Sequence, residues 1–277
     1  CAFIFIVTPI MCRPGNTPGR SRVNHIHRMN KMKMHFAKSA ILIACLMPAL
    51  VFAAHWSYEG AESPEHWGEL NSEYKECQFG KNQSPVDIDK ALKASLAPLA
   101  VHYTEGPAAL LNNGHTIQAS FTHNDANTIM LDGTAWTLQQ FHFHAPSENT
   151  VHGKHYAMEM HLVHKAVDGD TAVVAVMFET GAQNAALADL WSKIPNGVDK
   201  SETLTRTIDL NALLPADKTF WRFSGSLTTP PCSEGVTWLV MKHPLTLSQA
   251  QLDKFKAVMH HDNNRPVQPL HGRVVVE

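Results

Sequence analysis

Three histidines in two short segments could bind a metal ion. His142 and His144 are separated by one residue in the run Q-F-H-F-H, and His161 follows in E-M-H-L-V-H. Because side chains alternate between the two faces of a β-strand, His142 and His144 point the same way, and a neighbouring strand would bring His161 to that face. Three neutral imidazoles that leave a fourth tetrahedral position open are the ligand set of a catalytic zinc ion.

Two further side chains favour a metal site over a plain strand. An isolated H-x-H between phenylalanines is typical of a half-buried strand whose polar face meets water. Gln140, however, shares a face with His142, and Glu159 shares a face with His161 by the same two-residue step. A metal-bound imidazole needs a hydrogen-bond partner for its second nitrogen, which fixes the tautomer and the ring direction. Both expected strands carry such a partner, so the sequence predicts Zn2+ as the cofactor.

The elements that must position these histidines are short strands. Turn signals such as Asn112-Asn113-Gly114 and Asp132-Gly133 separate brief β-rich runs. The run 172–178 is continuously apolar, as expected of a central strand that is covered on both faces. The expected strands are 86–88, 116–121, 128–131, 136–144, 157–164, 172–178 and 236–242.

Helices are expected to be few and short. Ser248 with Gln251 three positions later forms a capping-box pattern, and Asn184 can cap a second helix. Strands this numerous and this short argue against a doubly wound parallel fold. We therefore expect a mainly β, single-domain protein built on a large twisted sheet.

Charge is distributed unevenly along the chain. The formal net charge is −2, yet seven of the 23 Lys and Arg side chains fall in residues 1–53, which contain no Asp or Glu. The other 16 basic side chains are outnumbered by 25 acidic ones. An acidic body with scattered lysines is a poor binder of nucleic acid, so we expect no nucleic-acid partner.

The basic N-terminal segment is typical of an export signal. Lys33 and Lys38 precede the apolar run 40–52, and residues 51–53 supply side chains suitable for cleavage before Ala54. The apolar run is too short to span a membrane comfortably. We expect no integral membrane segment after cleavage.

These features predict three parts of the chain. Residues 1–31 are expected to be upstream translation, residues 32–53 a signal peptide, and residues 54–277 one domain that is periplasmic or secreted. A lipoprotein tether through Cys45 is the second alternative, disfavoured because much apolar sequence follows that cysteine.

Two cysteines remain after the expected cleavage, Cys77 and Cys232. An even pair in an exported protein indicates a disulfide. The alternative, two buried free thiols, is disfavoured in an oxidising compartment.

Several ordered motifs together resemble the α-class carbonic anhydrases, in particular their exported bacterial members. The resemblance covers essentially all of residues 54–277. It implies a twisted, mostly antiparallel ten-stranded sheet with short surface helices, and zinc-dependent reversible hydration of carbon dioxide to bicarbonate and a proton by attack of zinc-bound hydroxide. The motifs are Q-F-H-F-H (140–144), S-E-N (147–149), E-M-H-L-V-H (159–164), G-S-L-T-T-P-P-C (225–232) and R-P-V-Q-P-L (265–270).

The resemblance also implies roles for residues around the zinc. Thr228 would accept the hydroxide proton while Glu148 accepts the proton of Thr228, so that a lone pair is aimed at the substrate. His144 would donate to a backbone carbonyl near Asn263, as His142 would to Gln140 and His161 to Glu159. An apolar wall would hold carbon dioxide, because this small substrate needs a dry surface. The matching positions are Val163, Val173, Leu227 and Trp238, with a contact from Thr229.

Proton release would use a histidine that titrates near neutral pH. His115 matches the shuttle position of the family, and Tyr58 and Asn113 match residues that order the intervening water. The other histidines, His261 among them, are interpreted as surface or packing residues. Two positions depart from the family pattern: Phe223 replaces a tyrosine found in some members, and Asn149 replaces a frequent histidine.

Two other classes of protein are disfavoured. A carbonic-anhydrase-like binding module without activity would typically have lost a zinc histidine, whereas this chain keeps all three. A zinc hydrolase or metal buffer is suggested by the 18 histidines, but H-E-x-x-H is absent from the sequence. Carbon dioxide and bicarbonate are the expected small-molecule partners, and the chain is expected to be a monomer or a homodimer.

Overall fold

The computed structural model describes residues 55–122, 125–205 and 208–277, all within one compact unit, Val51–Glu277. The expected upstream segment 1–31 and signal peptide 32–53 lie outside the described residues. None of the helices in the described part of the chain is long and apolar enough to cross a membrane.

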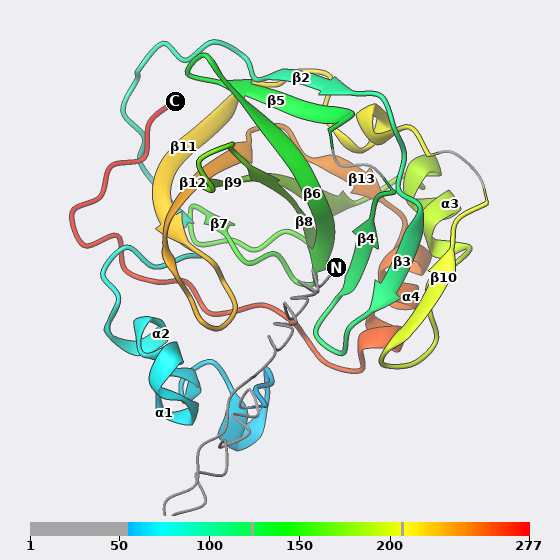
Figure 1. The fold of residues 1–277 in the computed structure, drawn as a ribbon, viewed down its shortest axis with the longest axis horizontal. Helices are drawn as coiled ribbons and strands as arrows, with labels where there is room; N and C mark the ends of the chain where they lie inside the picture. The colour runs from blue at the N-terminus through cyan, green and yellow to red at the C-terminus, as the bar shows by residue number, and fades with distance from the viewer. Residues whose placement is uncertain (1–54, 123–124, 206–207) are drawn as a thin grey trace, which may run out of the picture. The chain divides into compact units, whose positions relative to one another are not determined.

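A large twisted sheet forms the body of the protein (Figure 1). It has eleven strands in the part of the chain that the structure describes, one more than the ten expected. Its main order is β10-β3-β4-β6-β8-β9-β12-β11, while β5 pairs with β6 and β2, and β13 pairs with β9. The strands are β2 (Ala100–Tyr103), β3 (Ala109–Asn112), β4 (Ile117–Ser120), β5 (Asn127–Leu131), β6 (Thr134–His144), β8 (Met158–Lys165), β9 (Thr171–Thr180), β10 (Lys200–Thr203), β11 (Phe220–Ser226), β12 (Glu234–Met241) and β13 (Leu245–Leu247).

Most neighbouring strands are antiparallel, as expected, but β9 pairs in parallel with both β12 and β13. A parallel partner requires a long crossover, and the chain supplies one in residues 181–233 between β9 and β12. A separate two-stranded sheet joins β1 (Asp87–Ile88) to β7 (Thr150–Val151) in parallel.

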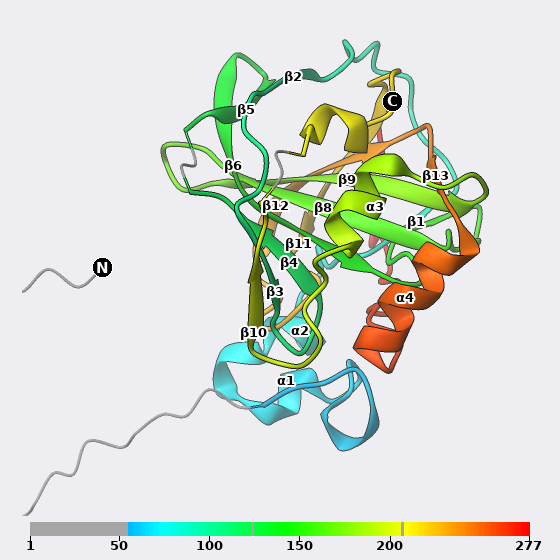
Figure 2. The same cartoon turned by 90° about the vertical axis from the view of Figure 1, so that its right-hand side faces the viewer.

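The helices are short and lie outside the sheet. Figure 2 shows α3 (Ala185–Trp191) beside α4 (Gln249–Met259), where the Trp191 and Phe255 rings stack with centroids 5.9 Å apart. The expected capping box of Ser248 and Gln251 is present at α4. The others are α1 (Trp67–Leu70), α2 (Glu76–Phe79) and the 3-10 helices η1 (Gly60–Glu62), η2 (Ser72–Tyr74) and η3 (Leu210–Leu213).

Strand β9 separates two hydrophobic cores. Its residues Val174, Val176 and Phe178 belong to the larger core, which also contains the buried faces of α3 and α4. The alternate residues Val173 and Ala175 belong to a smaller core on the other face of the sheet. The prediction of a central strand buried on both faces is confirmed.

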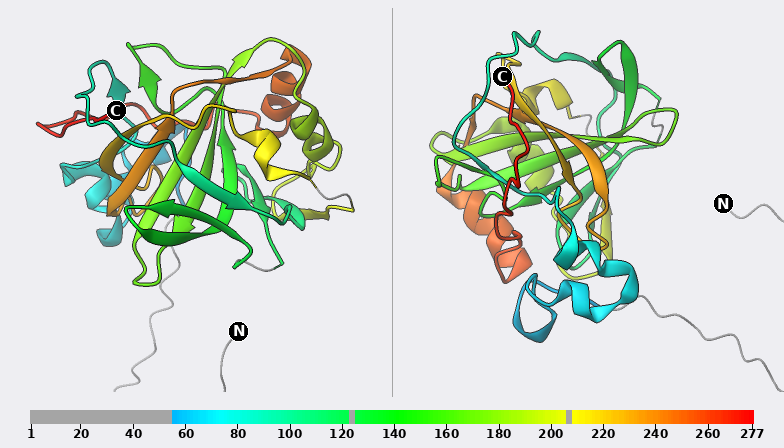
Figure 3. Two further views of the ribbon diagram at one scale, coloured as in Figure 1. Left: turned by 90° about the horizontal axis from the view of Figure 1, so that it is seen from above. Right: turned by 90° about the vertical axis from the view of Figure 1, so that its left-hand side faces the viewer.

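The C-terminal segment closes one side of the smaller core. Figure 3 shows it running beside β11, where Val276 bridges to Arg222, and Val275 is buried in this core. The last residues of the chain are therefore held against the sheet.

The register of β6 and β8 places the histidines. His142 lies directly opposite His161 in the antiparallel pair, and a register irregularity between Leu138 and Gln140 precedes them in β6. Phe143 points into the larger core, so the alternating histidines face the opposite side of the sheet.

Candidate active site

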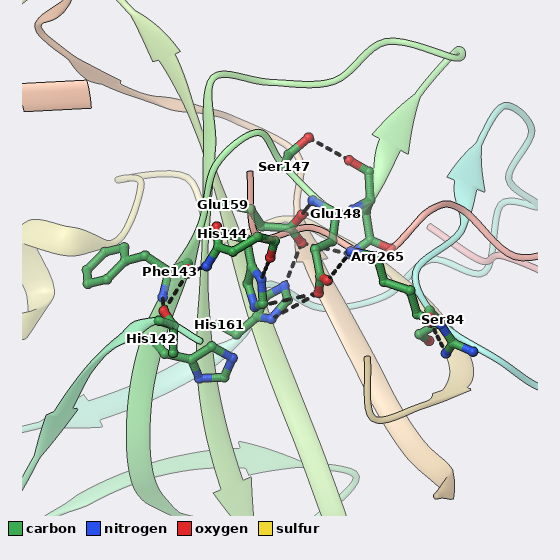
Figure 4. Close-up of polar contacts among 12 residues, drawn as sticks. Ser84, His142, Phe143, His144, Ser147, Glu148, Glu159, His161 and Arg265 are labelled. Carbon is green, nitrogen blue, oxygen red and sulfur yellow. Dashed lines mark hydrogen bonds and ion pairs between the residues drawn. The ribbon is translucent and has the colours of Figure 1, made fainter. Parts of the chain in front are cut away.

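Three imidazole rings converge on the face of the sheet opposite the larger core (Figure 4). Each of His142, His144 and His161 offers one ring nitrogen, and these three nitrogens lie within 4.8 Å of one another. The His144 and His161 ring centroids are 4.6 Å apart, and the His142 ring is 5.3 Å from that of His161. This spacing allows all three nitrogens to contact one metal ion.

The other nitrogen of each ring is held by an acceptor. His142 Nδ1 lies 2.8 Å from the Gln140 side-chain oxygen, and His161 Nε2 lies 2.9 Å from a Glu159 carboxylate oxygen. His144 Nδ1 lies 2.7 Å from the backbone carbonyl of Asn263. Because a carbonyl or carboxylate oxygen can only accept here, each of these nitrogens carries the proton, and the opposite nitrogen keeps a lone pair for a metal.

The environment keeps the three rings neutral. Burial lowers the pKa of His144, and lowers the pKa values of His142 and His161 far below the ordinary range. Repulsion between the neighbouring rings adds to the effect on His142 and His161. A neutral imidazole is the form that binds a metal ion, so metal binding competes with few protons at neutral pH.

Two buried atoms beside the rings lack hydrogen-bond partners among the described residues. They are His144 Nε2 and Glu148 Oε2, which lie 3.5 Å apart. Glu148 Oε2 is also 3.9 Å from His161 Nδ1. A buried lone pair without a partner lowers the stability of the folded protein unless a bound ligand interacts with it. The unpartnered atoms therefore fit a cation bound among the three rings.

Glu159 joins the His161 ring to the segment that carries Glu148. Its Oε1 accepts hydrogen bonds from His161 and from the Asn149 side-chain amide, at 2.9 and 2.7 Å. Its Oε2 accepts the backbone N–H groups of Glu148 and Asn149, at 2.7 and 2.8 Å. Asn149 also accepts the backbone N–H of Val86 at 3.0 Å through its side-chain oxygen. Burial raises the pKa of Glu159, and the hydrogen bonds from Asn149 oppose this effect.

Glu148 is fully buried and carries one firm hydrogen bond. Its Oε1 accepts the backbone N–H of Arg265 at 2.8 Å. Burial raises the pKa of Glu148 to about 8, while the Arg265 N–H and the Thr228 hydroxyl act in the opposite direction. A divalent cation among the adjacent histidines would lower this pKa and favour the carboxylate.

The Arg265 side chain ties the N-terminal part of the domain to the site. Its guanidinium donates to the Gln83 side chain and to the carbonyls of Ser84 and Cys77, each at 2.8 Å. Cys77 forms a disulfide with Cys232, which follows the loop that contains Thr228. The loop and Glu148 are therefore anchored to the same buried group of residues.

A cavity leads from the histidines to the surface. Asn113 shapes one wall, because its side-chain oxygen accepts the backbone N–H groups of His115 and Thr116 at 3.0 and 2.9 Å. The His115 ring stacks on Trp56, with centroids 3.7 Å apart and planes at 9°. The lining residues are Trp56, Tyr58, Asn113, His115, Thr116, Gln118, Gln140, His142, His144 and Thr229.

Apolar side chains also lie near the histidines. Val173 and Trp238 are buried in the smaller core, and Val163 and Leu227 pack against it. The Trp238 ring lies 4.9 Å from that of His161, and its indole N–H donates to the carbonyl of Ser226 at 3.0 Å. The four residues expected to contact carbon dioxide thus lie in one apolar cluster.

Sequence reasoning missed several residues of the site. Arg265 and Asn149 lie in loops, where no strand alternation indicates the direction of a side chain. Trp56 and Gln118 line the cavity, but neither residue belongs to a sequence motif that indicates a site. Phe223, the other departure from the family pattern, stacks on Trp238 with centroids 6.0 Å apart.

Comparison with known proteins places the chain in a family. The family described as eukaryotic-type carbonic anhydrase matches residues 62–277. A carbonic anhydrase of Klebsiella pneumoniae is 65% identical over 246 residues, which cover 89% of this chain and 100% of that protein. A carbonic anhydrase of Pectobacterium atrosepticum is 48% identical and covers 88% of this chain and 100% of its own length.

Solved structures agree. The α-carbonic anhydrase of Thermovibrio ammonificans, in complex with the inhibitor sulfanilamide, superposes with a TM-score of 0.79 at 48% identity, over 82% of this chain and 100% of that one. With a matching family over most of its length, close relatives and a shared fold, the chain belongs to the α-class carbonic anhydrases.

Proposed function

We propose that this protein catalyses the zinc-dependent reversible hydration of carbon dioxide to bicarbonate and a proton. The observation that carries the proposal is the trio of inward nitrogens on His142, His144 and His161, each with its second nitrogen held by an acceptor. Membership in the carbonic anhydrase family supports the same reaction.

The three histidines would hold the zinc ion. Zinc in such a site lowers the pKa of its water to about 7, so that hydroxide is available near neutral pH, as the carbonic anhydrases themselves exemplify. Because the ligands are uncharged, they leave the full positive charge of the ion to act on the water. Gln140, Glu159 and the Asn263 carbonyl would keep the rings in the tautomer that binds metal.

Thr228 and Glu148 would orient the attacking oxygen. The Thr228 hydroxyl can accept a proton from hydroxide only if it donates its own proton elsewhere, and the Glu148 carboxylate, whose pKa this hydroxyl lowers, would accept it. Together, Thr228 and Glu148 would orient the attacking oxygen so that one of its lone pairs is directed at the substrate. An anion that has no proton to offer Thr228 would bind less well.

Val163, Val173, Leu227 and Trp238 would form the surface that receives carbon dioxide, with Thr229 at its edge. A small apolar molecule gains from a dry wall and needs no charged partner. The same wall keeps bulk water away from the reacting carbon.

His115 would carry the released proton out of the cavity. Its half-buried ring lines the same cavity as His142 and His144, stacks on Trp56 and lies 6.4 Å from the ring of solvent-exposed His55. Tyr58 and Asn113 line the same cavity and would order water between the site and His115. Proton transfer of this kind needs a group that titrates near neutral pH.

The proposal extends to the location of the protein. The Cys77–Cys232 disulfide fits an oxidising compartment, and the N-terminal sequence fits a signal peptide over 32–53. We infer a periplasmic or secreted domain over 54–277, released after cleavage, that acts as a monomer or homodimer.

One experiment tests the reaction and its metal together. Stopped-flow hydration of carbon dioxide by the purified domain should be fast, should be lost after a chelator removes zinc, and should return when zinc is added. His142→Ala should lose both the bound metal and the activity, whereas the control His152→Ala changes an exposed histidine and should lose neither. Full hydration by a zinc-free His142→Ala protein would refute the proposal.

A further inference from the structure

Two further imidazoles, His55 and His261, lie near His115, which lines the cavity. His115 lies in the turn between β3 and β4, His55 precedes η1, and His261 follows α4. The His55 and His115 rings are 6.4 Å apart, and His261 is near enough to His115 to repel a proton on it. Segments from three distant parts of the sequence thus bring ionisable rings close to one another.

His261 has the geometry of a proton acceptor. Its ring lies beside Tyr58, with centroids 5.8 Å apart, and it is half-buried. His261 Nδ1 lies 3.0 Å from the carbonyl oxygen of Asp262, so Nδ1 carries the proton of the neutral ring and Nε2 keeps its lone pair. An imidazole held in this tautomer can accept a proton at Nε2 and release it to solvent.

Tyr58 connects His261 to the cavity. Tyr58 lines the cavity and its ring lies beside that of His261, and its hydroxyl has no hydrogen-bond partner among the described residues. Burial and the nearby charge of Glu148 raise the pKa of Tyr58 far above its usual value. Its hydroxyl therefore stays protonated and can bind water without itself exchanging charge.

The three imidazoles compete for protons. Burial lowers the pKa of His115 below its ordinary value, and repulsion from His55 and His261 lowers it further. A proton carrier works best when its pKa is close to that of the group that gives up the proton. The His261 ring, near His115, offers protons a second acceptor.

We propose that His261 is a second proton carrier, which removes protons from the cavity past Tyr58 in parallel with His115. This inference rests on the proposed carbon dioxide hydration. In each transfer the proton passes from cavity water to Nε2 of His261 and then to buffer, and no other bond is made or broken.

The charged surroundings of His261 are compatible with this role. Asp262 forms an ion pair with Lys256 at 3.1 Å, so its carboxylate is shared with a cation rather than committed to His261. His55 similarly pairs with Glu62 at 2.9 Å. His260, Tyr58 and His115 are the other ionisable groups near the ring.

The test separates proton release from the chemical step. We would measure kcat and kcat/KM of the zinc-loaded protein for His261→Ala, His115→Ala, the double variant and the control His102→Ala, an exposed histidine on β2. In dilute buffer, kcat of His261→Ala should fall about threefold while kcat/KM is unchanged, since only proton release involves the carrier. The double variant should be slower than His115→Ala alone, and added imidazole should restore all three.

Two results would overturn the inference. The first is equal kcat in dilute buffer with and without His261, both in the native background and beside His115→Ala. The second is a parallel fall of kcat and kcat/KM that imidazole does not restore, which would assign His261 a purely structural role. If the native protein itself did not hydrate carbon dioxide in concentrated buffer, the proposed function would fail as well, and this outcome is distinct from the other two.

Discussion

Two buried carboxylates in this site have the same chemistry but different surroundings. Glu159 receives four hydrogen bonds, from His161, from the Asn149 side chain and from two backbone N–H groups. Glu148 receives one from the Arg265 backbone and keeps Oε2 without a partner among the described residues. Glu159 therefore holds His161, a proposed metal ligand, whereas Glu148 retains an oxygen that is available for the reaction.

Replacing each carboxylate by its amide should therefore separate rate from metal binding. Glu148→Gln should retain zinc and lose about 100-fold in kcat, because Thr228 could then direct its proton at the hydroxide. Glu159→Gln should weaken zinc binding about 10- to 100-fold, because the amide no longer holds His161 as a carboxylate does. Competition with a chelator and stopped-flow hydration would measure the two effects. Unchanged hydration by Glu148→Gln would remove this residue from the scheme.

His164 gives a prediction about acid stability. It is fully buried on β8, with Nε2 2.7 Å from the Tyr103 hydroxyl, and burial lowers its pKa to about 3. In the unfolded chain the His164 ring is protonated as the pH falls below 6.5, whereas in the folded protein it stays neutral until about pH 3. The free energy of unfolding should therefore fall as pH falls, by about 2 kcal/mol from this residue between pH 7.5 and pH 5.

Urea unfolding at several pH values would measure this contribution. His164→Gln should lose stability overall but show a shallower decline between pH 7.5 and pH 5 than the native protein. The control His102→Gln alters an exposed histidine and should keep the native slope. An identical slope for His164→Gln would contradict the assignment.

At the residue scale, the alternation of side chains along a strand was the basis for predicting the hydrogen-bond partners of the histidines. It indicated that Gln140 and Glu159 lie beside their histidines, and the structure places both within hydrogen-bond distance. Loop residues gave no such signal. Asn149 was interpreted as a departure from the family pattern, yet it joins Glu159 to the backbone of Val86. A contact between segments so far apart in sequence depends on the tertiary fold.

At the scale of elements, the pairing of β6 with β8 matters most. His142 faces His161 directly, so a shift of one residue in this register would turn the histidines of one strand into the larger core. The alternate side chains Phe141 and Phe143 oppose such a shift, because both are fully buried in that core. Core packing thus maintains the metal geometry.

Substitutions at the start of α4 should lower the stability of the protein without changing its activity. Ser248→Ala should cost about 1 kcal/mol, because it removes the side-chain cap of the helix. Gln251→Ala should cost about 2–3 kcal/mol, because it also removes the bonds from the Gln251 side chain to the backbone N–H and carbonyl of Asn184 and leaves that N–H unpaired. Thermal unfolding would rank the two variants, and kcat/KM should be native for both. Equal losses would show that the bonds to Asn184 add little.

Long strands and capped helices were predictable from sequence, and so were the short strands β1, β4 and β5, whereas the short strand β10 was not. The runs that became β6, β8 and β9 carry strong apolar patterns, and the capping signal located α4. Strand β10 is exposed at all four residues and forms only by pairing with β3. The parallel pairing of β9 also escaped prediction, because a crossover leaves no local pattern.

At the scale of the whole molecule, the disulfide joins residues separated by 155 positions. Closing so long a loop restricts the unfolded chain, which is worth up to about 5 kcal/mol in the chain-entropy model. The double variant Cys77→Ser/Cys232→Ser should therefore unfold at lower urea concentration than the oxidised native protein. A reducing agent should destabilise the native protein and leave the variant unchanged. Two free thiols in the oxidised protein would contradict the assignment.

The position of Arg265 has a consequence for biosynthesis. Its guanidinium donates to the backbone carbonyls of Cys77 and Ser84, and its backbone N–H donates to Glu148, so these earlier segments depend on a residue that is translated long after them. A nascent chain still lacking residues 265–277 leaves those buried polar groups open to water. The catalytic centre can therefore be completed only after Arg265 has been translated, and a chain truncated before this residue would lack the contacts that hold Glu148 in place.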